Sequence, residues 1–117
     1  MSSSSRRRKP RHPSERRAAR WYRLRGYRIL ATNAWVAGYE LDVVVRRGRT
    51  VVFCEVKSKT GTAYGDPLEM VTPEKVRRVR RAAETWLAFH RECTGCLVRF
   101  DVIAVRGRKL ECLRGAF

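Results

Sequence analysis

Histidine is scarce in this sequence, and long apolar runs are absent. Only two histidines occur in 117 residues; His12 falls in a basic leading segment and His90 has no evident partner. Catalytic sets built on Ser, His and Asp, or on Cys and His, are therefore not supported. No stretch approaches the roughly 18 apolar residues of a membrane-spanning helix. A glycine-rich loop of the Walker type is also missing, which argues against a P-loop enzyme.

Acidic residues are few relative to basic ones. Lys and Arg number 27 against 11 Asp and Glu, which gives a formal net charge of +16. The segment 1–13 holds basic residues and no acid, and the remainder of the chain is still strongly basic. Such a charge on a small domain is typical of nucleic-acid binding. An anionic membrane surface and a merely solvated basic face are the alternatives.

The length and the leading segment indicate how the chain is organised. Residues 1–13 are basic, rich in Ser and interrupted by Pro10 and Pro13, which predicts a disordered arm. Residues 14–117 suit one domain with a modest core. Because no apolar segment follows the basic start, it does not have the form of a secretory signal. We therefore expect a cytoplasmic location and four free cysteine thiols.

The residue pattern predicts an α/β fold with a mixed central sheet of four or five strands flanked by helices. A first helix is expected at 14–25, with Pro13 or Ser14 at its start. A second helix is expected at 73–91, with Thr72 as N-cap and Pro73 as first residue. Strands are expected at 27–34, 39–47, 50–58, 97–105 and 109–114. The order is helix, three strands, helix, strand, with a further edge strand.

The hairpin of residues 39–58 carries the candidate site. If Gly48 and Arg49 form a two-residue type II′ turn, Arg47 pairs with Thr50. In that register Asp42 lies opposite Glu55, and Glu40 lies opposite Lys57. Alternation then puts these four side chains on one face of the hairpin. The other face collects an apolar layer, which supports this register over a one-residue slip: Val43, Val45, Val52, Cys54 and Val56.

Two facing carboxylates repel each other unless a cation lies between them. A hard divalent ion with oxygen ligands, Mg²⁺ or Mn²⁺, meets that need, so Asp42 and Glu55 are the candidate metal ligands. The carbonyl of Val56 offers one more oxygen. Lys57 is placed to orient a water or to stabilise charge on a phosphate during phosphodiester hydrolysis. The alternative interpretation is an ordinary salt-bridged solvent face.

An Asp on one strand, followed after a short turn by Glu-x-Lys on the next, resembles the restriction-endonuclease-like, PD-(D/E)xK superfamily. More narrowly, the chain resembles the small bacterial YraN-type family, uncharacterised proteins considered similar to archaeal Holliday junction resolvases. The resemblance covers roughly residues 14–105. Its carriers are Glu15-x-x-Ala18-Ala19, Gly26-Tyr27, Asn33, Gly38-Tyr39-Glu40-Leu41-Asp42, Phe53-Cys54-Glu55-Val56-Lys57, Gly65, Pro73, Lys75 and Arg99-Phe100-Asp101-Val102.

This resemblance implies a Mg²⁺- or Mn²⁺-dependent DNA endonuclease that prefers branched or structured DNA. Asp42 and Glu55 would bind the metal, and Lys57 would be the catalytic lysine. Glu15 would be an additional acid from the first helix, although an acid there also suits the helix dipole. Glu40 would support the ligand Asp without binding the metal. A non-catalytic nucleic-acid-binding protein on the same fold is the alternative.

Other residues around the hairpin are candidates for contacts with DNA. Basic side chains near the loop 59–71 and on the second helix would grip phosphates without reading sequence: Lys59, Lys75, Arg77, Arg78 and Arg81. Resolution of a branched junction needs two active sites, which implies a homodimer.

Two further features have competing interpretations. Cys93-x-x-Cys96 has the spacing of a metal clip, but a lone pair in a loop is a weak zinc signal. Asp101, in the middle of a strand, fits either a pairing with an Arg or a position at the edge of the core.

Overall fold

The structure, a computed structural model, describes residues 12–59 and 71–117, except for the side chain of Lys59. Its elements are α1 (Pro13–Arg23), β1 (Arg28–Val36), β2 (Tyr39–Arg47), β3 (Thr50–Lys59), α2 (Pro73–Ala88), the 3₁₀ turn η3 (Arg91–Cys93), β4 (Leu97–Arg106) and β5 (Lys109–Leu113). The predicted α/β class and the order of the elements are confirmed. Residues 1–11 of the expected arm, and most of the expected loop, lie outside the described residues.

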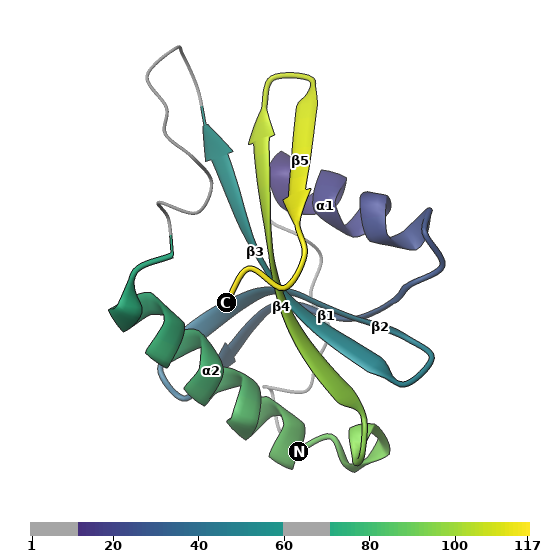
Figure 1. Cartoon of the computed structure of the whole chain (residues 1–117), viewed down its shortest axis with the longest axis vertical. Helices are drawn as coiled ribbons and strands as arrows, with labels where there is room; N and C mark the ends of the chain where they lie inside the picture. The colour runs from purple at the N-terminus through teal and green to yellow at the C-terminus, as the bar shows by residue number, and fades with distance from the viewer. Residues whose placement is uncertain (1–11, 60–70) are drawn as a thin grey trace.

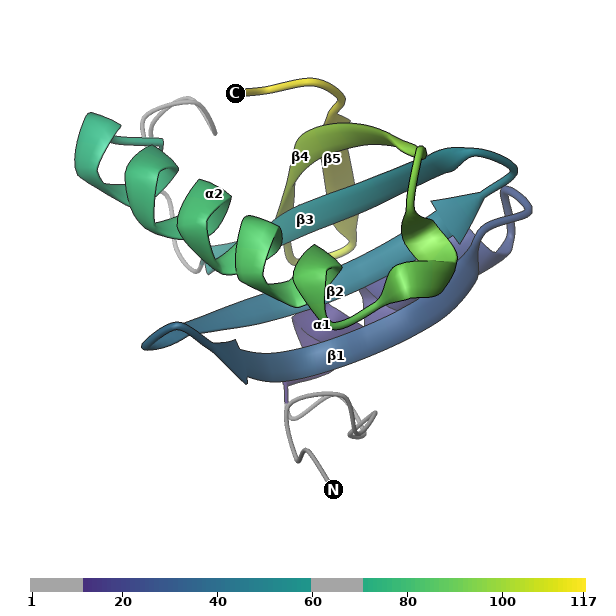
Figure 2. The same ribbon diagram turned by 90° about the horizontal axis from the view of Figure 1, so that it is seen from below.

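The five strands form one mixed sheet in the order β1-β2-β3-β4-β5. β3 and β4 run parallel, and the other neighbouring strands are antiparallel. The helices α1 and α2 lie on opposite faces of this sheet (Figures 1 and 2). Among the described residues, no helix has both the length and the apolar character needed to cross a membrane.

Both helices begin where side chains satisfy their first backbone N–H groups. At α1, His12 Nδ1 accepts a hydrogen bond from the backbone N–H of Ser14 at 3.1 Å, and Glu15 accepts one from His12 N–H at 3.3 Å. At α2, Thr72 Oγ1 accepts a hydrogen bond from Lys75 N–H at 3.2 Å, as its N-cap position predicts. α2 ends at Ala88, earlier than expected, because Phe89 leaves the helical conformation.

The hairpin register predicted from its turn is confirmed. Arg47 pairs with Thr50, and the antiparallel ladder runs from there to Val43 opposite Cys54. Gly48 has a φ of 59°, the left-handed value that the first position of a type II′ turn requires. The predicted apolar layer is present and packs against α1: Val43, Val45, Val52 and Cys54 are buried there, with Val56 partly buried beside them.

The opposite face of the hairpin is apolar over much of its length as well. Val44, Val51 and Phe53 pack against α2, where the rings of Phe53 and Trp86 meet edge to face with centroids 5.7 Å apart. The sheet is therefore buried on both faces. The acidic residues are confined to one end of the hairpin and do not cover a whole face.

The alternation of faces changes phase in the middle of β1 and β2. On each strand two apolar residues three positions apart pack on the same α2 side, which a regular strand does not allow: Ala31 with Ala34, and Leu41 with Val44. Between them lie Asn33, whose φ is 51°, and Asp42. The ladder between β2 and β3 also ends beside this point. At Asn33 and Asp42 the side chains therefore need not follow the alternation between the two faces of the sheet.

A buried carboxylate joins α1 to the sheet on the other face. Asp101 on β4 is fully buried and accepts hydrogen bonds from Tyr22 Oη at 2.7 Å and from Gly115 N–H at 3.0 Å. Arg99 forms an ion pair with it at 2.9 Å and also donates to Tyr27 Oη at 3.0 Å. Of the two interpretations of Asp101, the pairing with an Arg is the one present. This network holds α1 in place against β4.

Candidate functional site

Asp42 and Glu55 lie where β2 and β3 stop pairing. Beyond the last backbone pair, Asp42 Oδ2 accepts a hydrogen bond from the backbone N–H of Val56 at 2.9 Å. Glu55, the residue before Val56, has only 5% of its surface exposed, and Asp42 is partly buried. Each strand thus contributes one carboxylate to the point where the two strands separate.

Burial and mutual repulsion alter the titration of this acid pair. Burial raises the pKa of Asp42 to about 8, and the negative charge of Glu55 adds to that shift. Burial also raises the pKa of Glu55, although a hydrogen bond from Tyr39 and the charge of Lys75 act in the opposite direction. The metal-free pair therefore retains a proton near neutral pH, and a bound cation would favour its loss.

Two side chains that contact Glu55 come from the start of β2 and from the first turn of α2. Tyr39 Oη donates a hydrogen bond to Glu55 Oε1 at 2.6 Å, and Lys75 Nζ lies 3.7 Å from the same oxygen. Burial and the nearby Glu55 charge raise the pKa of Tyr39, so its phenol stays a donor. Sequence reasoning did not single out Tyr39 and assigned Lys75 to phosphate contacts. Both contacts depend on tertiary packing, which strand alternation does not reveal.

Glu15 borders the acid pair from α1. Its Oε1 accepts a hydrogen bond from Asn33 Nδ2 at 3.0 Å, across to the irregular point of β1. Its negative charge also contributes to the raised pKa of Asp42 and of Glu55. Because it caps α1 as well, the two interpretations of Glu15, helix-start residue and neighbour of the site, are compatible.

The other two predicted hairpin residues are Lys57 and Glu40. Lys57 is exposed and lies two residues beyond Glu55 on β3, where it pairs with Ala104 of β4. Glu40 pairs with Trp35 of β1. Because the alternation changes phase at Asp42, it no longer places Glu40 on the face of Glu55. Alternation alone therefore does not bring Glu40 to the other three side chains, and its place in the site stays a prediction.

The described residues hold no cluster of three or more His, Cys, Asp or Glu side chains that could bind a metal ion. Two carboxylates and water are nevertheless a common way to bind Mg²⁺, which keeps several water ligands. Cys93 and Cys96 are free thiols, and Cys93 is buried in the core beside α2. Nothing in ranges 12–59 and 71–117 thus supports a zinc clip there.

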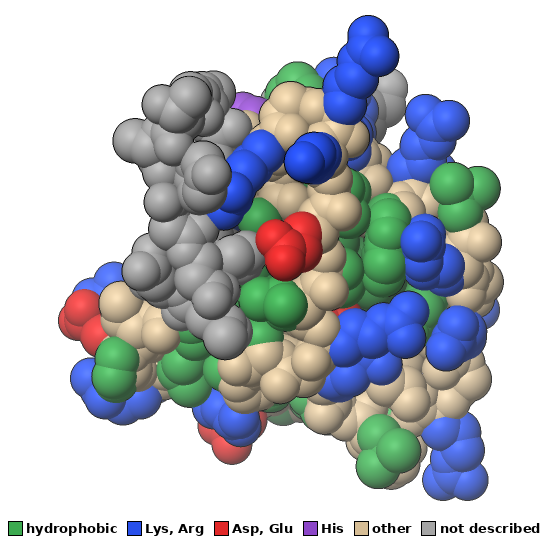
Figure 3. Space-filling model, turned by 45° about the horizontal axis from the view of Figure 1, so that its top comes forward, with side chains coloured by type: hydrophobic (Ala, Val, Ile, Leu, Met, Phe, Trp, Pro, Cys, Tyr) green, Lys and Arg blue, Asp and Glu red, His purple; other side chains and the backbone are tan. Residues whose placement is uncertain are grey.

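Figure 3 shows Lys and Arg side chains spread over one face of the described part of the molecule, with acidic ones sparse. Of the predicted phosphate contacts on α2, Arg77 and Arg81 are exposed. Arg78 is exposed as well and pairs with Glu74 at 3.1 Å. The side chain of Lys59 lies outside the described residues.

The fold and the site together define a small basic α/β domain with an acid pair at the point where two adjacent strands stop pairing. Comparison with known families places residues 14–105 in the uncharacterised protein family UPF0102, and the chain belongs to that family. A UPF0102 protein of Acidothermus cellulolyticus is 43% identical, over 88% of this chain and 89% of the relative.

Other relatives belong to different bacterial groups. A UPF0102 protein of Klebsiella pneumoniae is 39% identical, over 88% of this chain and 81% of the relative. The UPF0102 protein YraN of Escherichia coli is 37% identical, over 88% of this chain and 79% of the relative. The resemblance to the YraN-type family is thereby confirmed.

Proposed function

We propose that this chain is a metal-dependent endonuclease that hydrolyses phosphodiester bonds in branched or structured DNA. The observation that carries the proposal is the meeting of Asp42 and Glu55 where two paired strands separate, with Lys57 two residues further along. The proposal includes a restriction-endonuclease-like relationship and a likeness to archaeal Holliday junction resolvases. The net charge of +16 supports a nucleic-acid substrate.

The donor set fits a hard divalent cation. Asp42 and Glu55 would hold Mg²⁺ or Mn²⁺, with the Val56 carbonyl as a further oxygen, because hard cations prefer oxygen ligands. The raised pKa of both carboxylates supports this fit, since a cation relieves the repulsion that raises them. When bound, such an ion would polarise a phosphate and make a water molecule more acidic.

The chain's own residues would orient the ligands and the substrate. The N–H of Val56 fixes one oxygen of Asp42, and the hydroxyl of Tyr39 fixes one oxygen of Glu55. The ammonium group of Lys57 would stabilise negative charge that develops on the phosphate. Glu15, held by Asn33, would offer a further carboxylate toward water at the pair. The exposed arginines of α2, with Lys75 and Lys59, would hold the DNA backbone.

Burial argues against an ordinary solvent face. Charged residues on such a face stay hydrated, whereas Glu55 is 5% exposed. Moving carboxylates away from water is unfavourable unless they gain full compensation. A non-catalytic nucleic-acid-binding protein would use the basic surface without any need for this acid pair, which makes that function the second candidate to be tested.

The test is cleavage of labelled DNA by purified protein in Mg²⁺ or Mn²⁺, with EDTA as the metal-free control. Branched, flapped, single-stranded and linear duplex DNA are compared. We expect cleavage of structured DNA, and a loss of about 100-fold or more in Asp42→Asn and in Lys57→Ala. The matched control is Lys109→Ala, at an exposed Lys on β5.

Two results would contradict the proposal. The first is intact DNA under all metal conditions, which together with DNA binding would favour the non-catalytic function. The second is equal cleavage by Lys57→Ala and Lys109→Ala. Paired cuts across a four-way junction require two active sites, so we also propose a homodimer on such substrates, with cross-linking at assay concentration as the check.

A further inference from the structure

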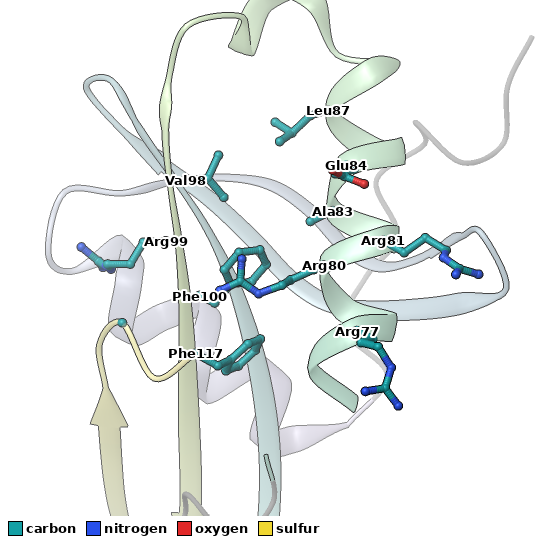
Figure 4. Close-up of a pocket in the computed structure, with 11 residues that line it drawn as sticks. Arg77, Arg80, Arg81, Ala83, Glu84, Leu87, Val98, Arg99, Phe100 and Phe117 are labelled. Carbon is teal, nitrogen blue, oxygen red and sulfur yellow. The ribbon is translucent and has the colours of Figure 1, made fainter. Parts of the chain in front are cut away.

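A groove of about 680 Å³ runs between α2 and β4, on the side of the sheet that α2 covers. Three arginines of α2 line it, at positions that a helix places near one another: Arg77, Arg80 and Arg81. The apolar lining comes from both elements and from the last residue, and Figure 4 shows these side chains around the groove: Leu87, Val98, Phe100 and Phe117. The groove thus combines positive charge with an apolar surface.

The aromatic part of this groove is held by a fixed set of contacts. The rings of Phe100 and Phe117 stack at 29° with centroids 5.2 Å apart, and the Arg80 guanidinium lies 4.9 Å from the centroid of Phe100. The backbone before Phe117 is anchored by a hydrogen bond from Ala116 N–H to the Phe100 carbonyl at 2.7 Å. The bond from Gly115 to Asp101 anchors it further. Phe100 itself is buried, with 7% of its surface exposed, so the partly exposed Phe117 supplies the accessible ring, and these contacts hold that ring in place before any ligand arrives.

The groove lies beside the acid pair, on the α2 side of the sheet. Phe117 lines the groove and also packs around Glu55 together with Val71, Lys75 and Val102, in a contact that leaves no room for a water molecule. Lys75 pairs with Glu55 from the first turn of α2, and the arginines of the groove follow it on the same helix. A strand with one phosphate at Lys75 would therefore continue along α2, past Phe117, to these arginines.

We propose that the groove binds a single strand of nucleic acid that extends from the cleavage site, an inference that rests on the proposed endonuclease function. The arginines pair with successive backbone phosphates, and the partly exposed ring of Phe117 stacks on an unpaired base. A duplex keeps its bases stacked inside and cannot use that surface. The substrate class is thus DNA with an unpaired strand next to the cut.

The test measures binding without cleavage, by fluorescence anisotropy in EDTA. The probes are a labelled single-stranded oligonucleotide, a strand of equal length that lacks bases, and a duplex. The groove variant combines Arg77→Gln, Arg80→Gln and Arg81→Gln. The matched control combines Arg16→Gln, Arg20→Gln and Arg23→Gln, which removes the same charge from exposed positions of α1 on the opposite face.

We expect the groove variant to bind the single strand at least tenfold more weakly, with a smaller loss in the α1 control. The slope of log K against log salt concentration should be shallower by about two in the groove variant, since each single-strand phosphate contact contributes about 0.7 to that slope. The unmodified protein should prefer the strand with bases at least fivefold over the strand without them. Phe117→Ala, at the chain end, should remove that preference while circular dichroism stays unchanged.

Equal losses in the two triple variants, or no preference for bases in the unmodified protein, would overturn the groove assignment. Cleavage is read separately in Mn²⁺, so the two proposals fail independently. DNA cleavage that is indifferent to the groove variant refutes the groove alone. Base-dependent binding in the groove without any cleavage supports the groove as a binding site and refutes the endonuclease proposal.

Discussion

Replacing Asp42 with Asn is expected to stabilise the metal-free protein at alkaline pH. Asn keeps a side-chain oxygen that can accept the hydrogen bond from Val56 N–H, so the local geometry is retained. The substitution removes the negative charge that burial and Glu55 make unfavourable. A gain in stability from the loss of a carboxylate would show that this position is not optimised for folding.

The direction and magnitude of this change in stability follow from the pKa of Asp42, which is raised from 3.8 to about 8. A carboxyl group whose pKa is higher in the folded than in the unfolded protein stabilises the fold fully at pH values below its unfolded-state pKa. This stabilisation is lost as the pH rises from the unfolded-state pKa to the folded-state pKa. Each pKa unit corresponds to about 1.4 kcal/mol, so a shift of this size sets an upper limit of about 6 kcal/mol. Because Glu55 shares the repulsion, we expect about 2–3 kcal/mol between pH 5 and 9.

The assay is urea unfolding in EDTA at a series of pH values from 5 to 9. At pH 5 the difference between the two proteins should be smaller than at pH 9, because only the first part of the loss that begins at the unfolded-state pKa of 3.8 has occurred there. At pH 9 the variant should be the more stable protein, with a flatter pH profile. Glu111→Gln, at an exposed residue of β5, is the matched control and should follow the unmodified protein. Mn²⁺ should raise the stability of the unmodified protein at pH 8 and leave the variant unchanged.

A variant that is less stable than the unmodified protein at pH 9 would refute the argument that Asp42 carries an uncompensated charge. Equal stabilisation of both proteins by Mn²⁺ would show that Asp42 does not bind the metal.

Three further substitutions test other parts of the structure. Asp101→Ala should lower the free energy of unfolding by about 3 kcal/mol, because it removes the fully buried acceptor of hydrogen bonds from Tyr22, Gly115 and Arg99; a loss below about 1 kcal/mol in urea unfolding would contradict the described network. Tyr39→Phe should weaken Mn²⁺ binding about tenfold through loss of the contact that orients Glu55; unchanged affinity by calorimetry would show that this contact is dispensable. Thr72→Ala should cost about 1 kcal/mol by removal of the α2 N-cap, whereas Thr94→Ala, at an exposed position away from any α-helix start, should be near neutral in thermal unfolding.

Local chemistry made several features of the fold predictable. Gly48 determines the hairpin turn, and the turn determines the register down to Val43 opposite Cys54. Thr72 followed by Pro73 is a strong helix start, and α2 begins there. Each of these features depends on residues close together in the sequence, so no knowledge of the tertiary structure was needed.

The site was only partly predictable, because part of it depends on a break in the regular pattern. The turn register predicts Asp42 near Glu55, and the ladder that it sets ends beside both; alternation alone does not place Glu40, since the phase changes at Asn33 and Asp42. Asn tolerates a positive φ better than most residues, and this was the one local sign of the break. The approach of Lys75 to Glu55 depends on how α2 packs on the sheet, which no local pattern contains.

The same sheet contains a second buried carboxylate, Asp101, with which the acid pair can be compared. Asp101 shows that this fold can satisfy a buried carboxylate completely, with an arginine, a tyrosine hydroxyl and a backbone N–H. Asp42 accepts a single hydrogen bond within the described residues, from Val56, while facing the charge of Glu55. Within residues 12–59 and 71–117, one carboxylate is fully compensated and the other only in part, and this contrast at Asp42 supports the proposed metal site. Perturbed groups of this kind concentrate at functional sites, and this contrast gives the proposed metal site a physical reason independent of its likeness to other nucleases.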